Sequence, residues 1–376
     1  MKRLLSSLGL LVASCTHTTD PNKQTTPAMS PAISNAEAKN LAIVGAKLRQ
    51  ADGSIATKTL HLAGGKIIAI DEKPAASDEK AFDAKGAFVV PGFIDSHVHI
   101  TFSVPEFALQ GGIVAALDLG APVSIWDEAP KMLPFRLYPS GQLLTAVGGY
   151  PTQGWGSNGY GREIRGVEDA KAAAQEVIKR GAKLVKMPLD PSGPLLSTAE
   201  QQAIVEAAHA AKLPVGSHAL TQSVVQMAFD VGVDVLVHAP VERLSEDLIT
   251  KFCARPKAAV ITTFEAFGVS SGALENVKRL KAAGCAVMYG SDLGNGVSSG
   301  ILMGELDDMR SIGMTPVEII DAATKTPAAY FGLDGLGEIA VGKNASFLLI
   351  DGDPYQDITK LETRLAIFAD GLEIKQ

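Results

Sequence analysis

The sequence predicts an α/β fold: a (β/α)8 TIM barrel with a small composite β-sandwich built from the N- and C-terminal flanks. Two observations carry this prediction. Between residues 91 and 336, apolar runs alternate with Ala- and charge-rich amphipathic stretches at intervals of roughly 20–30 residues, as βα units do. Residues 40–90 and 337–376 instead show short alternating strands separated by turn residues. With 376 residues, 46% of them apolar, the chain can form a large core.

Each element follows from its local pattern. The N-terminal flank reads LAIVGAKL, TLHLAGGKIIAI and KAFDAKGAFVV, and the C-terminal flank reads GEIAVGKNASFLLIDGD and RLAIFADGLEI. The expected barrel strands are Phe88–His99, Gly112–Leu119, Leu143–Gly148, Ala182–Met187, Leu213–His218, Val233–His238, Ala258–Phe264 and Cys285–Ser291. The helices between them include Val167–Arg180, Thr198–Ala211, Gln222–Val231 and Gly272–Ala283, and the last spans Pro316–Phe331. A doubly wound sheet is the alternative, but no glycine-rich phosphate fingerprint follows the first strand.

The first 39 residues indicate export. Residues 1–15 have a basic start and a short apolar core, and they end in Val-Ala-Ser-Cys, which resembles a bacterial lipobox with Cys15 as the lipidated residue. An ordinary secretory signal with an incidental cysteine is the alternative. Residues 16–39 are rich in Thr, Pro, Ser and Asn and predict a flexible tether. If the host is Gram-negative, we expect a protein anchored to the outer membrane, facing the periplasm, through its N-terminal lipid only.

Charge and composition exclude several partners. The 34 basic and 41 acidic residues give a net charge of −7, without the basic face that a nucleic-acid partner would require. No apolar run reaches the roughly 20 residues needed to cross a bilayer. We therefore expect a small-molecule substrate, and the sequence leaves a homo-oligomer open. Cys253 and Cys285 could pair in an oxidising compartment, but two buried thiols are the favoured interpretation.

Histidines at strand ends point to a metal. His97 and His99 close the first barrel strand, and alternation turns both imidazoles to the same face. His218 and His238 each end a later strand. A single histidine in such a place is best explained as a core or capping residue, but four of seven at strand ends of one barrel favour ligands, because barrel active sites form at that face.

Two further residues complete the candidate site. Asp292 ends the eighth strand, where its ordinary role is to cap the next helix, but facing four imidazoles it is better explained as a ligand and proton carrier. Lys186 ends the fourth strand, and an inward salt bridge is an equally good explanation from the residues alone. Burial beside cations favours the neutral amine, which can react with carbon dioxide to give a carbamate that bridges two metals.

From about Ala42 to Gly371 the chain resembles the amidohydrolase superfamily, within it the imidazolonepropionase-like and Xaa-Pro dipeptidase-like branch. The resemblance rests on VVPGFIDSHVHI, GAKLVKM, the two further strand-end histidines, GSD and the tail TPVEIIDAATKTPAAYFGLDGLGEIAVGKNASFLLIDGDP. It implies two divalent metal ions, the more buried one held by His97, His99 and Asp292. His218 and His238 would hold the more exposed one, with carboxylated Lys186 bridging both.

The resemblance also implies the chemistry. A hydroxide between the metals would attack a carbonyl, with Asp292 as general base and then general acid. Zinc is the first choice for these ligands, and manganese, cobalt or iron fit nearly as well. Single-metal deaminases of the superfamily carry a Glu three residues after the strand-five histidine, where this chain has Thr221. Hydrolysis of an amide, cyclic amide or dipeptide is therefore favoured over deamination.

The chain departs from its dipeptidase-like relatives where the substrate should lie. It reads Gly148-Gly149-Tyr150 where many relatives have Gly-Gly-His, and MPLDPSG after Lys186 instead of a glycine-rich turn. Tyr150, Trp155, Tyr160 and Arg162 are the candidates for substrate contacts, although ordinary surface-loop packing explains them equally well. A lactonase or organophosphate esterase using the same site, and a non-catalytic surface-binding lipoprotein, are the alternative functions.

Overall fold

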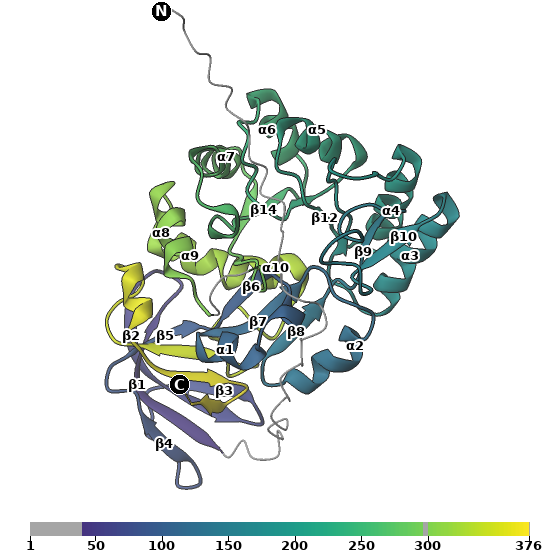
Figure 1. The fold of residues 1–376 in the computed structure, drawn as a ribbon. Helices are drawn as coiled ribbons and strands as arrows, with labels where there is room; N and C mark the ends of the chain where they lie inside the picture. The colour runs from purple at the N-terminus through teal and green to yellow at the C-terminus, as the bar shows by residue number, and fades with distance from the viewer. Residues whose placement is uncertain (1–39, 296–299, 376) are drawn as a thin grey trace, which may run out of the picture.

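The computed structural model describes residues 40–295 and 300–375. Figure 1 shows a body of parallel strands wrapped by helices, with an antiparallel-rich sheet beside it at the lower left. The expected signal peptide (residues 1–15), the lipidation site Cys15 and the tether (residues 16–39) lie outside the described residues. Within the described ranges, no helix is long and apolar enough to cross a membrane.

The parallel strands fall into three sheets, of order β6-β7-β8, β9-β10 and β11-β12-β13-β14-β15. Their bounds are β6 Phe93–Val98, β7 Ile113–Asp118, β8 Arg136–Pro139, β9 Leu143–Ala146, β10 Gly161–Ile164, β11 Val185–Lys186, β12 Val215–Ser217, β13 Val235–Leu236, β14 Ala259–Ile261 and β15 Ala286–Met288. Every expected barrel strand therefore contains an observed one. The sequence pattern did not predict β8 or β10, which are only four residues long and partly exposed.

The first and last of these strands meet. The amide of Ser96 in β6 donates to the carbonyl of Tyr289, just after β15, at 3.0 Å, and Val98 forms a parallel bridge with Leu293. This meeting brings the ends of β6 and β15 together, although the two strands are about 190 residues apart in the chain.

Helices alternate with these strands. They are α1 Pro105–Gln110, α2 Ile125–Glu128, α3 Val167–Lys179, α4 Thr198–Ala210, α5 Gln222–Val231, α6 Glu246–Cys253, α7 Ser271–Ala282, α8 Met303–Ser311, α9 Pro316–Ala322 and α10 Lys325–Phe331. Local hydrogen bonds define where two of these helices begin. Ser197 and Glu200 form a capping box at the start of α4, and Thr315 and Glu318 form one at the start of α9.

The expected single helix Pro316–Phe331 is in fact two, α9 and α10. At the break, the carbonyl of Ala322 accepts from the amide of Tyr289 at 2.9 Å, and that of Ala323 accepts from the amide of Ile94 at 2.7 Å. A continuous helix would use both carbonyls internally. The prediction was wrong because the strands at this end of the body take these acceptors, a tertiary contact with no local signal.

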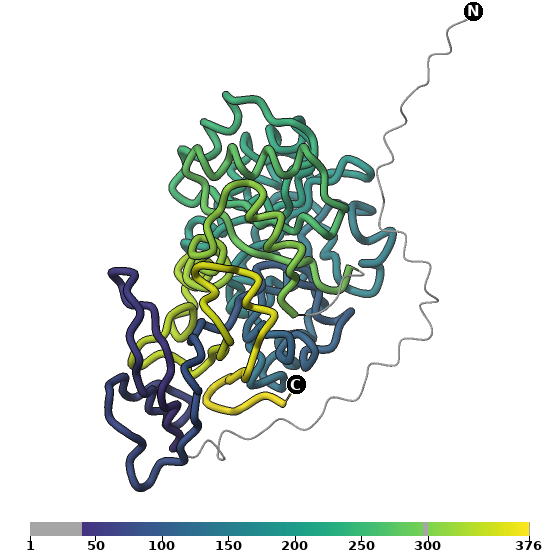
Figure 2. Tube along the Cα trace, turned by 90° about the vertical axis from the view of Figure 1, so that its left-hand side faces the viewer, coloured from purple at the N-terminus to yellow at the C-terminus, as the bar shows by residue number. Residues whose placement is uncertain are grey.

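Both flanks build one eight-stranded sheet, of order β18-β17-β16-β5-β1-β2-β3 with β4 paired to β1. Figure 2 shows the N-terminal flank (purple) and the C-terminal flank (yellow) beside each other in the lower left part of the view. The bounds are β1 Leu41–Arg49, β2 Ile55–Ala63, β3 Lys66–Asp71, β4 Lys80–Asp83, β5 Phe88–Pro91, β16 Phe347–Ile350, β17 Arg364–Ala369 and β18 Leu372–Ile374. Strands of both flanks thus share one sheet, while the composite β-sandwich stays a prediction.

The expected strand Phe88–His99 divides at Gly92. Its first part, β5, pairs with β16 in the flank sheet, and its second part, β6, pairs with β7 in the body. A Cβ at position 92 would overlap the side chain of Val114 in β7, so only glycine lets the chain pass here. The division places His97 and His99 at the end of a strand that belongs to the body alone.

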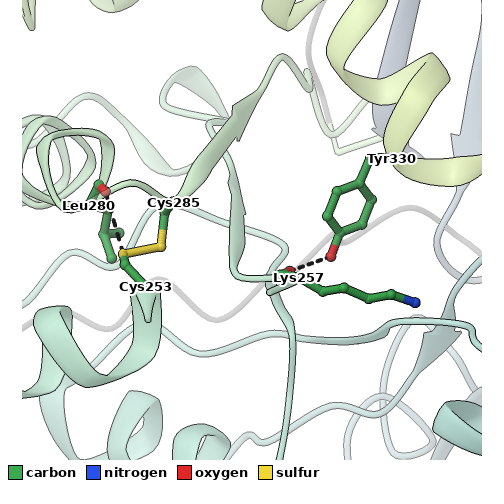
Figure 3. The surroundings of a disulfide bond; sticks show 5 residues. All are labelled: Cys253, Lys257, Leu280, Cys285 and Tyr330. Atoms are coloured by element: carbon green, nitrogen blue, oxygen red, sulfur yellow. Dashed lines mark hydrogen bonds between the residues drawn. A yellow bond between two sulfur atoms is a disulfide. The ribbon is translucent and has the colours of Figure 1, made fainter. Parts of the chain in front are cut away.

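Cys253 and Cys285 form a disulfide, so the favoured interpretation as two free thiols was wrong. Cys253 ends α6 and Cys285 precedes β15, which brings their Cα atoms to 4.8 Å across 32 residues of sequence (Figure 3). The sequence does not reveal that the two Cα atoms are close, because the packing of α6 against β15 that brings them together is tertiary.

Candidate metal centre

His97 in β6 and His99, just after it, present the same ring nitrogen to one point. The Nδ1 of His97 lies 2.8 Å from the carbonyl oxygen of Val237, and the Nδ1 of His99 lies 3.3 Å from that of Gly120. A carbonyl oxygen only accepts, so Nδ1 carries the proton in both rings. Each Nε2 is then left with a lone pair, the form in which imidazole binds a metal.

Asp292 faces both of these nitrogens. Its Oδ1 lies 3.4 Å from the Nε2 of His97 and 3.4 Å from the Nε2 of His99. Its backbone is left-handed, with φ of 56°, and its amide donates to the carbonyl of His97 at 2.8 Å. Among the described residues no helix begins directly after Asp292, so its carboxylate is not seen in its ordinary role as a helix N-cap.

The three donors fit a divalent metal ion. In the described part of the chain, the Nε2 of His97 and the Oδ1 of Asp292 are buried and have no hydrogen-bond partner. Such orphaned atoms cost free energy unless a ligand satisfies them. Two donors at about 2.1 Å from one tetrahedral zinc ion would lie about 3.4 Å apart. His97, His99 and Asp292 also form the one cluster of metal-ligating side chains found among the described residues.

His218 and His238 adjoin this triad. The ring centroid of His238 lies 4.5 Å from that of His97 and 4.8 Å from that of His218. The Nδ1 of His238 lies 2.9 Å from the Oγ1 of Thr263, which leaves its Nε2 on the opposite side of the ring. The four imidazoles therefore form one continuous group at the ends of β6, β12 and β13.

Burial makes this group electrostatically unusual. Burial lowers the pKa of Lys186, at the end of β11, to about 7, against the opposing effect of Asp292. Burial and then the charge of Lys186 lower the pKa of His97 well below its ordinary value, and the same two causes lower that of His218 to about 4. The imidazoles of His97 and His218 are consequently neutral near pH 7, as metal ligands must be.

Asp95, which the sequence analysis did not single out, holds the backbone beside the metal-ligand candidates in place. Asp95 Oδ1 accepts the amides of His97 and Ser291 at 3.1 and 3.0 Å, and its Oδ2 accepts the hydroxyl of Ser291. Burial raises the pKa of this carboxyl to about 7. Asp95 thus links the backbone on both sides of the triad. The only local signal was its place two residues before His97, on the same strand face.

Two of the four predicted substrate contacts, Trp155 and Tyr150, lie beside the imidazoles, and a third, Tyr160, packs against Trp155. Trp155 is 5.0 Å from His99 and Tyr150 is 5.6 Å from His218, between ring centroids, while Tyr160 packs 5.5 Å from Trp155. Phe102 and Phe267 were missed: Phe102 stacks on Tyr160 and Phe267 lies 4.8 Å from His238. Their only signal was position, in loops that follow strand ends.

Arg162, the fourth predicted contact, is engaged elsewhere. Its guanidinium donates to the carboxylate of Asp169 in the first turn of α3 at 2.5 Å and to the carbonyl of Glu163 at 2.6 Å. These bonds give Arg162 a role in anchoring β10 to α3. A place for it beside the imidazoles stays a prediction.

The comparisons with known proteins agree with this geometry. The family model "Amidohydrolase family" matches residues 88–370, which include β5, the whole parallel body and most of the C-terminal flank. The chain belongs to the amidohydrolase family.

Individual relatives are distant. An uncharacterised protein of Mycobacterium bovis is 24% identical over 327 residues, covering 76% of this chain and 85% of the relative. An imidazolonepropionase of Symbiobacterium thermophilum is 24% identical over 361 residues, covering 76% and 82%. The structure of a prolidase from Bifidobacterium longum superposes with a TM-score of 0.73 at 22% identity, covering 90% of this chain and 95% of that one.

These likenesses establish what kind of protein this is. The structural one shows a TIM-barrel-like α/β fold for this amidohydrolase. The family is one of metal-dependent hydrolases acting on C–N bonds, and the triad His97, His99 and Asp292 is a site of the expected kind.

Proposed function

We propose that this amidohydrolase hydrolyses a C–N bond in a small amide, cyclic amide or dipeptide, using two divalent metal ions. His97, His99 and Asp292 would hold one ion, His218 and His238 the other, and Lys186, as its carbamate, would lie between them. One observation carries the proposal: the Nε2 of His97 and the Oδ1 of Asp292 are buried, face each other at 3.4 Å, and have no hydrogen-bond partner among the described residues.

Metal ions bound here would lower the pKa of a water molecule towards neutrality and withdraw electron density from the carbonyl oxygen. The side chains supply the rest. Hydrogen bonds at Nδ1 hold the rings of His97, His99 and His238 with Nε2 inward. The carboxylate of Asp292 takes a proton from the attacking water and delivers it to the leaving nitrogen. Water adds to the carbonyl carbon, the C–N bond breaks, and the products are an acid and an amine.

The surroundings of Lys186 support the carbamate. The side chain is buried at the end of β11, with 2% of its surface exposed. Burial favours the neutral amine, the form that attacks carbon dioxide. The new N–C bond forms as the nitrogen loses one proton, and the product is an anion with two oxygens. An anionic ligand would also offset the positive charge of two metal ions in a site whose only described acidic ligand is Asp292.

We propose further that the protein is exported and held by a lipid on Cys15. The disulfide between Cys253 and Cys285 supports export, because such bonds persist in oxidising compartments and are rare in the cytosol. Zinc is the metal that we propose first, since imidazole and carboxylate ligands suit it.

The deciding experiment is the metal content of tag-free protein, purified in bicarbonate without chelators and measured by elemental analysis. Two equivalents per chain, with hydrolysis of at least one amide in a screen of dipeptides, N-acyl amino acids and lactones, would support the proposal. One equivalent would remove the bridging role of Lys186. No metal after reconstitution would overturn the proposal and favour a binding protein.

A further inference from the structure

Asp118, the last residue of β7, is a buried acid that the proposed mechanism does not use. It has 0% of its surface exposed, and a carboxylate in such a place is unfavourable unless hydrogen bonds satisfy its oxygens. β7 pairs in parallel with β6 (Figure 1), and in this pairing Asp118 stands opposite Val98, the residue before His99. The acid therefore lies where the chain leaves β6 and enters the candidate metal centre.

The side chain of Asp118 binds two segments of the chain at once. Its Oδ2 accepts the amide of Ile100 at 3.1 Å, and its Oδ1 accepts the amide of Gly120 at 3.0 Å. Ile100 begins the short 3-10 helix Ile100–Phe102, whose first amides have no acceptor within the helix. One carboxylate thus joins the segment that follows β6 to the turn that follows β7.

Both of these segments control His99. Ile100 directly follows His99, so its amide belongs to the peptide group that also contains the carbonyl of His99. Gly120 supplies the carbonyl oxygen that lies 3.3 Å from the Nδ1 of His99. This distance is already at the long end for an N–H···O bond, so a small displacement of either segment would break it. Asp118 holds the backbone that carries the ring and also the residue that accepts the proton of the ring.

The turn at Gly120 packs closely against the imidazole. A Cβ at this position would lie 3.2 Å from the Cε1 of His99 and 2.5 Å from the Cδ1 of Leu143 in β9. The glycine therefore stands between the ring and a neighbouring strand, with no space for a side chain. A movement of this turn is consequently passed to the ring of His99 by direct contact.

A carboxylate is the side chain that this arrangement requires. It offers two acceptor oxygens and no hydrogen, so it can accept two backbone amides, whereas asparagine has one acceptor oxygen and would turn its amino group towards the second amide. Asp95 accepts two amides in the same way beside His97. Each of the two histidines at the end of β6 therefore has its own buried acid that holds the backbone around it.

We propose that Asp118 is a positioning residue for His99, which it holds in the tautomer with Nδ1 protonated and Nε2 free to bind a metal ion. It acts through Gly120 and through the peptide group after His99. Without Asp118, the neutral ring can lose the proton at Nδ1 and gain one at Nε2, and the triad then loses one of its three donors. The effect on metal binding rests on the proposed function, and the effect on the tautomer does not.

The tautomer can be measured without metal. The full chain, labelled with 15N-histidine and treated with a chelator, is studied by NMR at about pH 8, where an ordinary imidazole is neutral. A spectrum of His99→Gln identifies the ring signals of His99. In the wild type, Nδ1 should carry the proton. In Asp118→Ala and in the milder Asp118→Asn, the two nitrogen shifts should move towards the form protonated at Nε2. Unchanged ring signals of His99 in both variants would overturn the proposal.

Zinc affinity tests the consequence for the metal. Competition with a chelator should show that Asp118→Asn binds one of the two zinc equivalents about tenfold more weakly than the wild type, while the other equivalent changes little. Asp118→Ala should weaken the same equivalent further. Wild-type affinity for both equivalents in Asp118→Ala would contradict the positioning role.

Asp234→Asn is the matched control for a general loss of stability. Asp234 is also buried, accepts the amide of Val215 at 2.9 Å and lies 2.8 Å from the Nε2 of His209. It precedes β13, whereas His238 follows that strand, so it lies at the strand end away from the candidate metal centre. Its replacement should lower the Tm without changing the tautomer of His99 or the zinc affinity.

The control also separates the possible results. Equal weakening of zinc binding in Asp118→Asn and Asp234→Asn would overturn the positioning role in favour of a general structural one. A wild-type protein that binds no zinc would overturn the proposed function. A tautomer shift in the Asp118 variants alone would still sustain the role of Asp118 in that case.

Discussion

The Oδ1 of Asp292 lies 3.4 Å from the Nε2 of His97, and neither atom has a hydrogen-bond partner in the described part of the chain. Both are buried. The pair exists because the residues after β15 return to the end of β6, where the amide of Asp292 donates to the carbonyl of His97. Two acceptors held together without a donor destabilise the metal-free protein, so the arrangement is best explained by a cation between them.

Asp292→Asn tests this relationship. Asparagine tolerates the left-handed backbone, so the turn should survive. Loss of the carboxylate should lower kcat about a thousandfold, because no group then accepts the proton of the attacking water. The metal-free variant should have an equal or higher Tm, since the new amide can donate to the Nε2 of His97. Asp307→Asn, an exposed carboxylate on α8, is the control and should change neither quantity. Retained activity in Asp292→Asn would exclude it as the proton carrier.

Lys186→Ala tests the proposed bridge. The variant should lose activity and part of its metal content, because the anionic ligand between the two positions is gone. Short carboxylic acids, which mimic a carbamate, should restore part of the activity. Lys183→Ala is the control: this lysine precedes β11 and donates to the carbonyl of Gly332, away from the imidazoles. Full activity in Lys186→Ala would contradict the bridging role.

The disulfide should stabilise the folded protein. It closes a segment of 32 residues, for which the chain-entropy model gives about 3.7 kcal/mol at 25 °C. Dithiothreitol should therefore lower the Tm of the wild-type protein in a thermal scan. The double variant Cys253→Ala/Cys285→Ala should have a low Tm that dithiothreitol does not change. An unchanged wild-type Tm after confirmed reduction would contradict the prediction.

Glu305 should make stability fall as the pH rises. Burial raises its pKa from 4.5 to about 8, although the carboxyl accepts the amides of Phe264 and Glu265 at 3.0 and 3.1 Å. Between these two values the folded state holds a proton that the unfolded state has released. The contribution of Glu305 to the free energy of unfolding is therefore present below pH 4.5. It decreases by about 1.4 kcal/mol per pH unit as the pH rises towards 8.

Urea unfolding of wild type and Glu305→Gln between pH 5 and 8 measures this effect. The difference in unfolding free energy, wild type minus variant, should fall with rising pH. Glu318→Gln is the control, because hydrogen bonds from Lys281 and Thr315 lower the pKa of Glu318 and place its effect below pH 4.5. A pH-independent difference for Glu305→Gln would show that its carboxyl is already ionised at pH 5.

The local pattern was sufficient for most of the fold. The apolar runs located all of the parallel strands except β8 and β10, and Ser197 and Thr315 mark two helix starts by their capping boxes. The pattern failed where a tertiary contact competed with it. Gly92 divides one apparent strand because Val114 occupies the space of a side chain, and the carbonyls of Ala322 and Ala323 divide one apparent helix.

The candidate site was predicted by residue type and position, because imidazoles and carboxylates at strand ends of one barrel gather at the same face. Its supporting residues could not be predicted in this way. No local pattern marks Asp95, Thr263 or Phe267. Asp95 matters because it accepts the amide of Ser291 from a distant part of the chain. Thr263 and Phe267 matter because both contact His238.

The sequence by itself determined the parallel α/β body, the joining of the two flanks and the six positions expected to hold metal, since periodicity and strand-end chemistry are local properties. The tertiary structure alone decided that the two cysteines pair, that Arg162 binds Asp169, and that Trp155 and Phe267 pack beside the imidazoles. These depend on distances between segments far apart in the chain, and such distances are set only when helices and strands pack against one another.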